Sequence, residues 1–441
     1  MPHNEPKEKH DHQTLKFPDG FLWGASTSAY QVEGNNINSD WWEWEQKNQP
    51  PHLRSSTACD QYNRYEQDFD LIKQLNHNSH RLSIEWSRIE PKEGEFDTHE
   101  LEHYKSVLKA LKNRNIKVML TLWHFTLPIW VADIGGWENG KTVKLFERFV
   151  KRIVPQIAEY VDFFITLNEP EVYIYQGYIT REWPPAKKGF WAKVKVNLNL
   201  AAAHKKVYKF LHSNYPDKPV GIANNIQSFE PYHKHSILEQ LAVIFSDIGA
   251  NHIFYILTRN THDFLGINYY FHTRFKKTEG LIPQVADASK ESQDISDLGW
   301  EIYPEGLFDV LADLSDHIPI YITECGIAST NDDRRNRFLI TYLHEVYRSI
   351  QSGVNVRGFF YWSLIDNFEW HRGFDPRFGL IEIDYKTMER HIRPSALVYT
   401  DIIQHNGIPH SLLRFIGHTV QASEVLEKRL KEELKRESHK L

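Results

Sequence analysis

The chain has 441 residues, of which 41% are apolar, and its formal net charge is −6 at pH 7. This length suits one large barrel domain, and the apolar fraction is sufficient to fill a core. The weakly acidic balance provides no basic stripe, so neither nucleic acid nor a membrane surface is expected as a partner.

Other features of the sequence favour a cytoplasmic location. No run approaches the roughly 20 consecutive apolar residues of a spanning helix, and the polar start MPHNEPKEKHDHQ lacks the apolar part of a signal peptide. The two cysteines, Cys59 and Cys325, make no disulfide framework, and there is no Asn-x-Ser/Thr glycosylation site. Both observations weakly favour a reducing compartment.

Short apolar runs recur along the chain and are separated by longer segments with the period of an amphipathic helix. The runs span residues 21–27, 80–86, 117–124, 162–170, 220–225, 263–270, 318–326 and 356–363. The clearest helical segments span residues 99–115, 141–160 and 335–353. Alternating strands and helices predict a parallel sheet, and eight such units predict an α/β fold, a (β/α)8 TIM barrel with a single domain. A doubly wound sheet is disfavoured, because no G-x-G-x-x-G follows the first strand.

Three segments describe the predicted domain organisation. Residues 1–15 are expected to be a disordered N-terminal segment, and residues 16–419 to form the barrel. Residues 420–441 are predicted to be a charged helical tail. The apolar stripe of this tail is narrow, so a solvated tail and a docked helix both stay open.

Two glutamates lie where predicted strands end. Glu169 ends the fourth run and precedes Pro170, while Glu324 ends the seventh. Barrel active sites are built at the carboxyl ends of the strands, and glycoside hydrolysis needs one acid and one carboxylate. Most other polar candidates also fall near strand ends, with Arg81, near the start of its run, as the exception. A pair of glutamates across a packed barrel therefore predicts a glycosidase site.

Several long motifs in the same order resemble glycoside hydrolase family 1, the β-glucosidase family, over most of the chain. The matching segments are FPDGFLWGASTSAYQVEG, RLSIEWSRIEP, TLWHFTLPIW, ITLNEP, DFLGINYY, YITECG and YWSLIDNFEWHRGFDPRFGL. The resemblance implies a retaining, exo-acting β-glycosidase that hydrolyses terminal non-reducing β-D-glucosides through a covalent glycosyl-enzyme intermediate. Side activity on β-D-fucosides or β-D-galactosides is also implied.

Carried over by motif, the resemblance implies that Glu169 is the acid/base and Glu324 the nucleophile. Residues implied to support the nucleophile are Arg81, Asn268 and Tyr270. Residues implied to bind the substrate are Gln31, His124, Asn168, Trp362, Glu369 and Trp370. Purely structural roles stay open for some of them: Arg81 as an ion pair, His124 as a core histidine and Trp362 as barrel packing.

The sequence departs from the family pattern in three places. Cys325 stands where the family usually has asparagine, which raises the question of how Glu324 is hydrogen-bonded. The segment before residue 263 is shorter than usual, so a thinner, more mobile or more open barrel wall is expected there. The extension beyond Ile408 has no counterpart in the family.

Alternative functions are a non-catalytic glycan-binding protein on the same barrel and a 6-phospho-β-glycosidase. The first is disfavoured because both glutamates are present, and the second because Glu369 would repel a phosphate. No cofactor is expected, and no H-E-x-x-H or C-x-x-C motif supports a metal site. The expected partner is a small β-glycoside or oligosaccharide, and the sequence does not indicate the oligomeric state.

Overall fold

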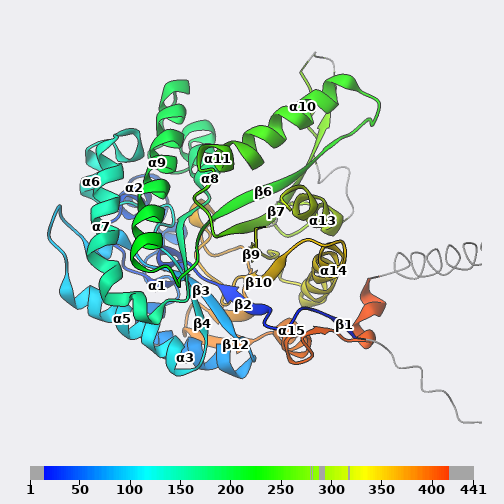
Figure 1. Cartoon of the computed structure of the whole chain (residues 1–441), viewed down its shortest axis with the longest axis horizontal. Coiled ribbons are helices and arrows are strands. Elements are labelled where there is room, and N and C mark those ends of the chain that lie inside the picture. Colours follow the sequence, from blue (N-terminus) through cyan, green and yellow to red (C-terminus); the bar gives the residue numbers. More distant parts are fainter. Residues whose placement is uncertain (1–13, 279, 281, 288–293, 316–317, 417–441) are drawn as a thin grey trace, which may run out of the picture.

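The computed structural model describes residues 14–278, 280, 282–287, 294–315 and 318–416. Most of the segment predicted to be disordered, residues 1–13, lies outside this range, as does the predicted helical tail at 420–441. Leu15 belongs to a short strand, β1 (Leu15–Lys16). The described part of the chain forms the barrel drawn in Figure 1.

Eight parallel strands close into a barrel, which confirms the predicted fold. The barrel strands are β2 (Leu22–Ser26), β3 (Ser79–Ser83), β4 (Lys117–Thr121), β5 (Phe163–Asn168), β6 (Val220–Pro231), β7 (Phe264–Lys276), β9 (Ile320–Cys325) and β10 (Val356–Trp362). They neighbour one another in sequence order, and the pairing of β10 with β2 closes the ring. A short strand, β8 (Gln284–Val285), pairs antiparallel with β7.

Helices follow the strands and cover the outside of the barrel (Figure 1). After the first four strands these are α1 (Ala29–Glu33), α2 (Asp40–Asn48), α3 (Gln61–Gln74), α4 (Trp86–Ile89), α5 (Thr98–Asn113), α6 (Ile129–Asp133), α7 (Lys141–Ile157), α8 (Pro170–Ile174) and α9 (Phe190–Asn214). After the last four they are α10 (Ile237–Asp247), α11 (Ile253–Leu257), α13 (Pro304–Asp313), α14 (Asp332–Gln351) and α15 (Pro394–Gln404). Two π-helical turns, η4 (Tyr175–Thr180) and η5 (Ile248–His252), extend α8 and join α10 to α11.

The described residues form three apolar clusters, of which a small one surrounds Trp362 and two hold the barrel together. The inner cluster fills the barrel with side chains from seven of its strands: Leu22, Met119, Ile165, Ala223, Phe264, Tyr321 and Phe360. The outer cluster is much larger and lies between the strands and the helices. The inner cluster closes the barrel below the strand ends, so polar groups gather only above it.

The predicted strands agree with the observed ones to within a few residues, except at β6 and β7. These two strands continue past the barrel and stay paired from Gly221 and Phe264 as far as Pro231 and Phe275. The expectation of an open wall at this shortened segment is therefore wrong for the strands. The wall is closed by the long β6–β7 pair, and α10 packs against its outside.

One helical run among the described residues is long and apolar enough to cross a membrane by length and composition. It spans Ile237–Leu257 and comprises α10, η5 and α11, with 11% of it buried. The run contains Glu239, Gln240, Ser246 and Asp247, so it is not the uninterrupted apolar stretch sought in the sequence. In the fold the run packs along β6, so it is a surface helix of the barrel.

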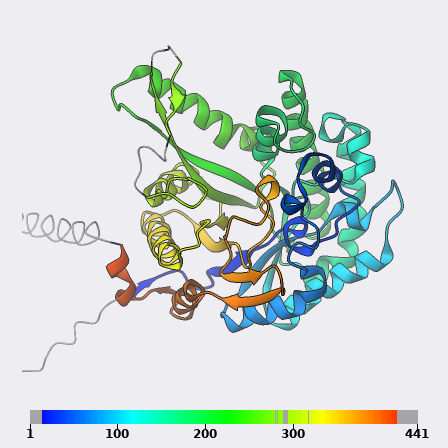
Figure 2. The same cartoon turned by 180° about the vertical axis from the view of Figure 1, so that it is seen from behind.

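Two small sheets lie outside the barrel. Strand β1 pairs antiparallel with β13 (Gly407–Ile408), through Leu15 with Ile408 and Lys16 with Gly407. The hairpin of β11 (Ile381–Asp384) and β12 (Glu389–Ile392) follows β10, and Figure 2 shows it in orange from behind. The pairing of β1 with β13 joins the first and last strands of the domain.

Candidate active site

Glu324 lies at the end of β9 inside the barrel mouth, and two side chains hold its carboxylate. The guanidinium of Arg81 donates to Oε1, and the hydroxyl of Tyr270 donates to Oε2 at 2.8 Å. Arg81 and Glu324 are both buried, with side-chain exposures of 1% and 5%. Both partners stabilise the ionised form of the carboxyl group, because each donates to it.

Arg81 is fixed by further contacts inside the barrel. Its Nη2 donates to Oδ1 of Asn168 at 2.6 Å, and its Nε donates to Oγ1 of Thr121 at 3.2 Å. The observed strand β3 begins at Ser79, so Arg81 lies in the middle of the strand and projects into the barrel. Although Arg81 lies near the start of the predicted apolar run, its side chain still reaches the residues at the barrel mouth.

Glu169 follows β5 and occupies a different environment. Its backbone is left-handed, with φ of 44°, and its amide donates to the carbonyl of Ala223 at 2.8 Å. Oε1 accepts from Asn268 at 2.9 Å and from Asn225 at 3.1 Å. Burial, and then the nearby charge of Glu324, raises the pKa of Glu169 to about 8. Glu169 is therefore protonated near neutral pH.

Sequence reasoning assigned no role to two of the residues around Glu169 and Asn268. Asn225, at a predicted strand end, donates to Glu169, and Thr323 donates to Oδ1 of Asn268 at 2.6 Å. The position of Asn225 at the end of the fifth apolar run could have indicated that it belongs to the site. Thr323 had none, since its contact depends on the register between β7 and β9.

Glu369 and Gln31 lie together at the edge of the site. Nε2 of Gln31 lies 3.4 Å from Oε2 of Glu369, and it also donates to the carbonyl of Phe368 at 2.8 Å. Burial, and then the charges of Glu324 and Glu169, raises the pKa of Glu369 to about 8. Three carboxyl groups thus influence one another, as expected when like charges share one pocket.

Aromatic rings line the same region. The ring of His124 is nearly parallel to those of Trp362 and Trp370, at centroid distances of 6.4 and 6.3 Å. Burial holds the pKa of His124 well below its usual range, so the ring is neutral. Nε2 of His124 lies 3.2 Å from the amide nitrogen of Asn168. The structure therefore brings all the predicted site residues to one end of the barrel.

Cys325 does not disturb the hydrogen bonding of Glu324. Its side chain is fully buried in the outer apolar cluster, and burial raises the pKa of the thiol. Alternation along β9 turns it away from the barrel interior, whereas Glu324 points inward. The next residue, Gly326, lies against β10, and a Cβ there would be 1.7 Å from the carbonyl oxygen of Trp362. The turn after Glu324 therefore requires glycine.

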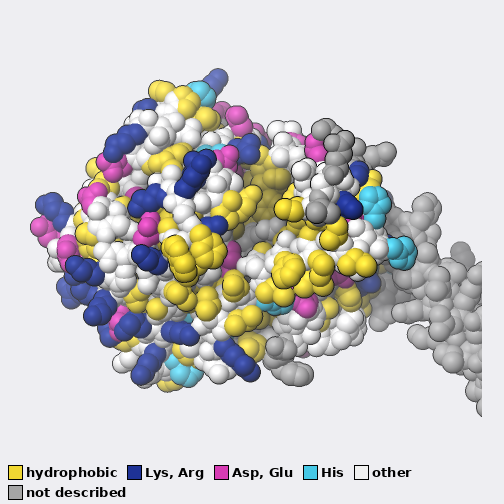
Figure 3. Space-filling model, turned by 90° about the horizontal axis from the view of Figure 1, so that it is seen from above, with side chains coloured by type: hydrophobic (Ala, Val, Ile, Leu, Met, Phe, Trp, Pro, Cys, Tyr) yellow, Lys and Arg dark blue, Asp and Glu magenta, His cyan; other side chains and the backbone are white. Residues whose placement is uncertain are grey.

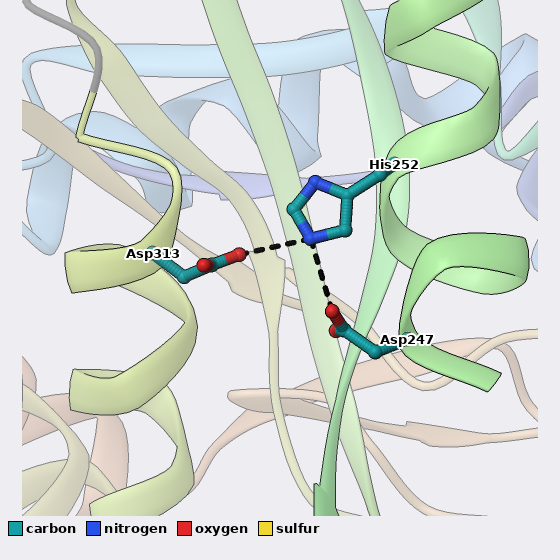
Figure 4. A group of neighbouring side chains, drawn as sticks. All are labelled: Asp247, His252 and Asp313. Atoms are coloured by element: carbon teal, nitrogen blue, oxygen red, sulfur yellow. Dashed lines mark ion pairs between the residues drawn. The ribbon is translucent and has the colours of Figure 1, made fainter. Parts of the chain in front are cut away.

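A separate cluster of charged groups lies away from the mouth (Figure 4). Nε2 of His252 is 3.1 Å from Asp247 and 2.9 Å from Asp313. Among the described residues this is the one group whose donor atoms are close enough together to hold a metal ion. Direct contacts between the imidazole and the two carboxylates account for the same geometry, and they tie η5 to the end of α13.

A closed (β/α)8 barrel with two buried glutamates at the carboxyl ends of facing strands defines a glycoside hydrolase site. The model of the family described as glycosyl hydrolase family 1 matches residues 13–254 and 239–408. The chain therefore belongs to glycosyl hydrolase family 1 and is a β-glycosidase.

Individual relatives agree with this assignment. The β-galactosidase of Sulfolobus acidocaldarius is 31% identical, over 90% of this chain and 97% of the relative. The β-glycosidase structure from Pyrococcus horikoshii has a TM-score of 0.86 at 36% identity, covering 92% of this chain and 99% of that one. The β-glucosidase from Thermotoga maritima in complex with castanospermine has a TM-score of 0.82 at 27% identity, covering 89% and 99%.

Proposed function

We propose that the protein is an exo-acting, retaining β-glucosidase, with Glu324 as nucleophile and Glu169 as acid/base. The observation that carries this assignment is the contrast between the two carboxyl groups. Glu324 accepts from Arg81 and Tyr270, whereas the pKa of Glu169 is raised to about 8 by burial and by Glu324. A carboxyl group that is protonated at neutral pH is suited to the acid role, and a carboxyl group that accepts from a cation and a hydroxyl is suited to the role of nucleophile.

In the first step the Glu324 carboxylate attacks the anomeric carbon of a β-glucoside, and the bond from that carbon to the leaving oxygen breaks. Glu169 gives its proton to the leaving oxygen, so the aglycon departs as a neutral alcohol. The product is a glycosyl ester of Glu324. Forming the ester removes the negative charge that raises the pKa of Glu169.

In the second step Glu169, now ionised, accepts a proton from water. The water oxygen bonds to the anomeric carbon from the face that the aglycon left, and the ester bond to Glu324 breaks. Two inversions give net retention. Asn168 accepts from Arg81, which also donates to Glu324, and from Asn268, which also donates to Glu169, so it is placed to bind a hydroxyl of the reacting sugar.

Azide rescue tests the two roles separately. Glu324→Ala is expected to lose nearly all turnover and to regain part of it with azide, giving an α-glycosyl azide, because azide occupies the vacant face. Glu169→Ala should keep the first step for aryl glucosides with good leaving groups and give the β-azide. Proton NMR identifies both anomers. An exchange of the two products between the variants would reverse the assignment, and an α-sugar released first by the wild type would exclude retention.

We further propose that the glycon is not phosphorylated. Glu369 faces the pocket beside Gln31, and an ionised or hydrogen-bonding carboxyl group suits sugar hydroxyls better than a phosphate dianion. The adjacent cations do not offset this, since Nδ1 of His371 accepts from Trp183 at 2.9 Å and Arg372 is exposed. Some side activity on β-fucosides and β-galactosides is expected, because these sugars would make the same contacts as glucose with the other residues of the site.

The ratio of kcat/KM for an aryl β-glucoside and its 6-phosphate tests this selectivity. The wild type should favour the unphosphorylated substrate by at least about a hundredfold, equivalent to roughly 3 kcal/mol, because a phosphate dianion would lose its hydration beside Glu369 in a buried site. Glu369→Ser should narrow the ratio by weakening the first substrate more than the second. Equal values for the wild type would contradict the proposal.

A further inference from the structure

Helix α10 and its continuation through η5 and α11 have an unusual surface. The segment ILEQLAVIFSDIGANHIFYIL is apolar on nearly all sides, and such a helix is normally buried. Here Glu239, Asn251 and Phe254 are its buried residues, while Ile237, Phe245 and Ile256 are 72%, 71% and 64% exposed. The structure thus leaves an extensive aliphatic and aromatic surface uncovered.

The acidic groups of this helix do not face outward as free charges. The Glu239 carboxylate accepts from the backbone amides of His233 and Lys277 at 2.6 and 2.7 Å, and it lies 2.9 Å from Nδ1 of His233. Asp247 is engaged with His252 in the cluster of Figure 4. The ends of the long β6–β7 pair place Lys234 and Lys277, both exposed, beside the start of α10. The apolar surface is therefore bordered by cations.

A second apolar group lies at the start of α9, on the same side of the molecule as α10 (Figure 1). Phe190 and Trp191 are 66% and 73% exposed, and Lys188 and Lys195 beside them are exposed as well. The view from above shows hydrophobic side chains on both sides of a hollow, with lysine and arginine among them on the α9 side (Figure 3).

Contrary to the expectation from the overall charge, we propose that this face, formed by α10 to α11 and the start of α9, docks on a lipid bilayer that carries anionic headgroups. The exposed apolar side chains of α10 and the start of η5, namely Ile237, Leu241, Ile244, Phe245 and Ile248, form one broad stripe on the side away from β6. Two observations favour lipid over a protein partner for this stripe. Exposed lysines border the apolar side chains, and tryptophan and phenylalanine lie next to lysine. These are the features of helices that lie in the membrane interface.

The barrel topology fixes the orientation of this face. Helix α10 follows the outer end of β6, and α9 follows β5 through α8 and η4, so the first turns of both helices lie at the same end of the barrel as Glu169 and Glu324. The ion pairs of His252 with Asp247 and Asp313 hold η5 against α13, which keeps the apolar side chains facing outward. The docked barrel thus has its mouth beside the membrane surface. The inference does not depend on the hydrolytic reaction.

Flotation with vesicles tests the docking. The wild type should float with vesicles of phosphatidylcholine and phosphatidylglycerol in equal parts, and less with pure phosphatidylcholine or at high salt, because the lysines contribute electrostatic attraction. The double variant Phe245→Ser/Ile256→Ser should lower the partition coefficient at least tenfold, and Trp191→Ser severalfold, since each loses apolar area in contact with lipid. The matched control is Leu397→Ser, which removes a side chain 58% exposed on α15, away from this face.

Two further measurements make each outcome decisive. Turnover of a soluble aryl β-glucoside should be unchanged in all variants, which shows that they are folded and separates this inference from the proposed function. Sedimentation velocity without lipid gives the oligomeric state. A wild type that does not float overturns the proposal, as does equal flotation of the double variant. A dimer that dissociates in the double variant, without vesicle binding, would assign the face to a second copy of the chain.

Discussion

Glu169 owes its suitability as an acid to opposing influences within a few ångströms. Burial and the charge of Glu324 raise its pKa, while hydrogen bonds from Asn268 and Asn225 lower it, and the net result is a pKa of about 8. A group with this pKa is protonated at neutral pH and loses its proton above about pH 8. The alkaline limb of the pH profile is therefore expected there.

Removing one donor should move that limb. Asn225→Ala deletes the amide that donates to Oε1 of Glu169 at 3.1 Å, which destabilises the ionised form and raises its pKa. The alkaline limb of kcat/KM should shift upward by about half a unit to one unit, as expected for one hydrogen bond to a charged group. The measurement is kcat/KM for an aryl glucoside across pH. A limb that stays in place or moves down would mean that another group controls it.

The paired strand-end glutamates could be predicted from the sequence, because each follows an apolar run. The supporting roles needed the family resemblance. Arg81 illustrates why, since its position within the run did not show that its side chain crosses the barrel to Glu324. Thr323 contacts Asn268 only through the register of β9 beside β7, which a single sequence does not display.

At the scale of elements, the β strands were predictable because parallel strands buried on both faces appear as continuous apolar runs. The outer halves of β6 and β7 were not, since they carry polar residues such as Glu230, His272 and Arg274. These strands pair with each other beyond the barrel, so only their first halves have the pattern of a barrel strand. The exposure of α10 was not predictable either, because a helix with so many apolar residues is normally buried.

The close contact between Gly326, which follows β9, and Trp362, at the end of β10, can be tested by substitution. A Cβ at Gly326 would meet the carbonyl oxygen of Trp362 at 1.7 Å, so Gly326→Ala must displace β10 or the turn after Glu324. We expect a loss of about 3 kcal/mol or more in the free energy of unfolding, with activity strongly reduced. Chemical denaturation and kcat give both quantities.

Gly249 provides the matched control, because nothing lies within 4 Å of a Cβ built there. Gly249→Ala lies in η5 and should be neutral or slightly stabilising, since alanine favours helical backbone. Equal stability of the two variants would show that the β9–β10 contact is looser than the structure has it.

At the scale of the whole molecule, buried titratable groups should give stability a broad maximum between about pH 4.5 and 6.5, where the opposing effects of carboxyl groups and histidines offset each other. Burial raises the pKa of Asp40 and of Glu171 to about 8, so the folded state holds these protons while the unfolded chain releases them, and stability falls as pH rises toward 8. Burial lowers the pKa of His77 and His80 to about 3, so the unfolded chain takes up protons first as pH falls below 6.5. Stability is then lost on the acid side too.

Glu171→Gln isolates the alkaline part of this dependence. Both carboxylate oxygens of Glu171 are buried without a hydrogen bond, and Asn224, although near enough to lower its pKa, does not meet hydrogen-bond geometry. The substitution should raise the free energy of unfolding by about 1 to 3 kcal/mol at pH 9 and change it little at pH 5. Glu95→Gln, at an exposed site, is the control. Equal effects of Glu171→Gln at both pH values would contradict the assignment of the alkaline loss of stability to the buried Glu171 carboxyl group.

The cytoplasmic location that the sequence favours stays a prediction.

The short pairing of β1 with β13 has a consequence for chain connectivity. Leu15 and Lys16 lie hydrogen-bonded beside Ile408 and Gly407, so the backbone of the barrel domain nearly forms a ring. Because β2 and β10 are already neighbours, moving the chain termini to another loop would leave the order of the strands around the barrel unchanged. A circular permutant that joins these two ends by a short linker and opens the chain at the unobstructed Gly94 turn retains every strand pairing of the barrel.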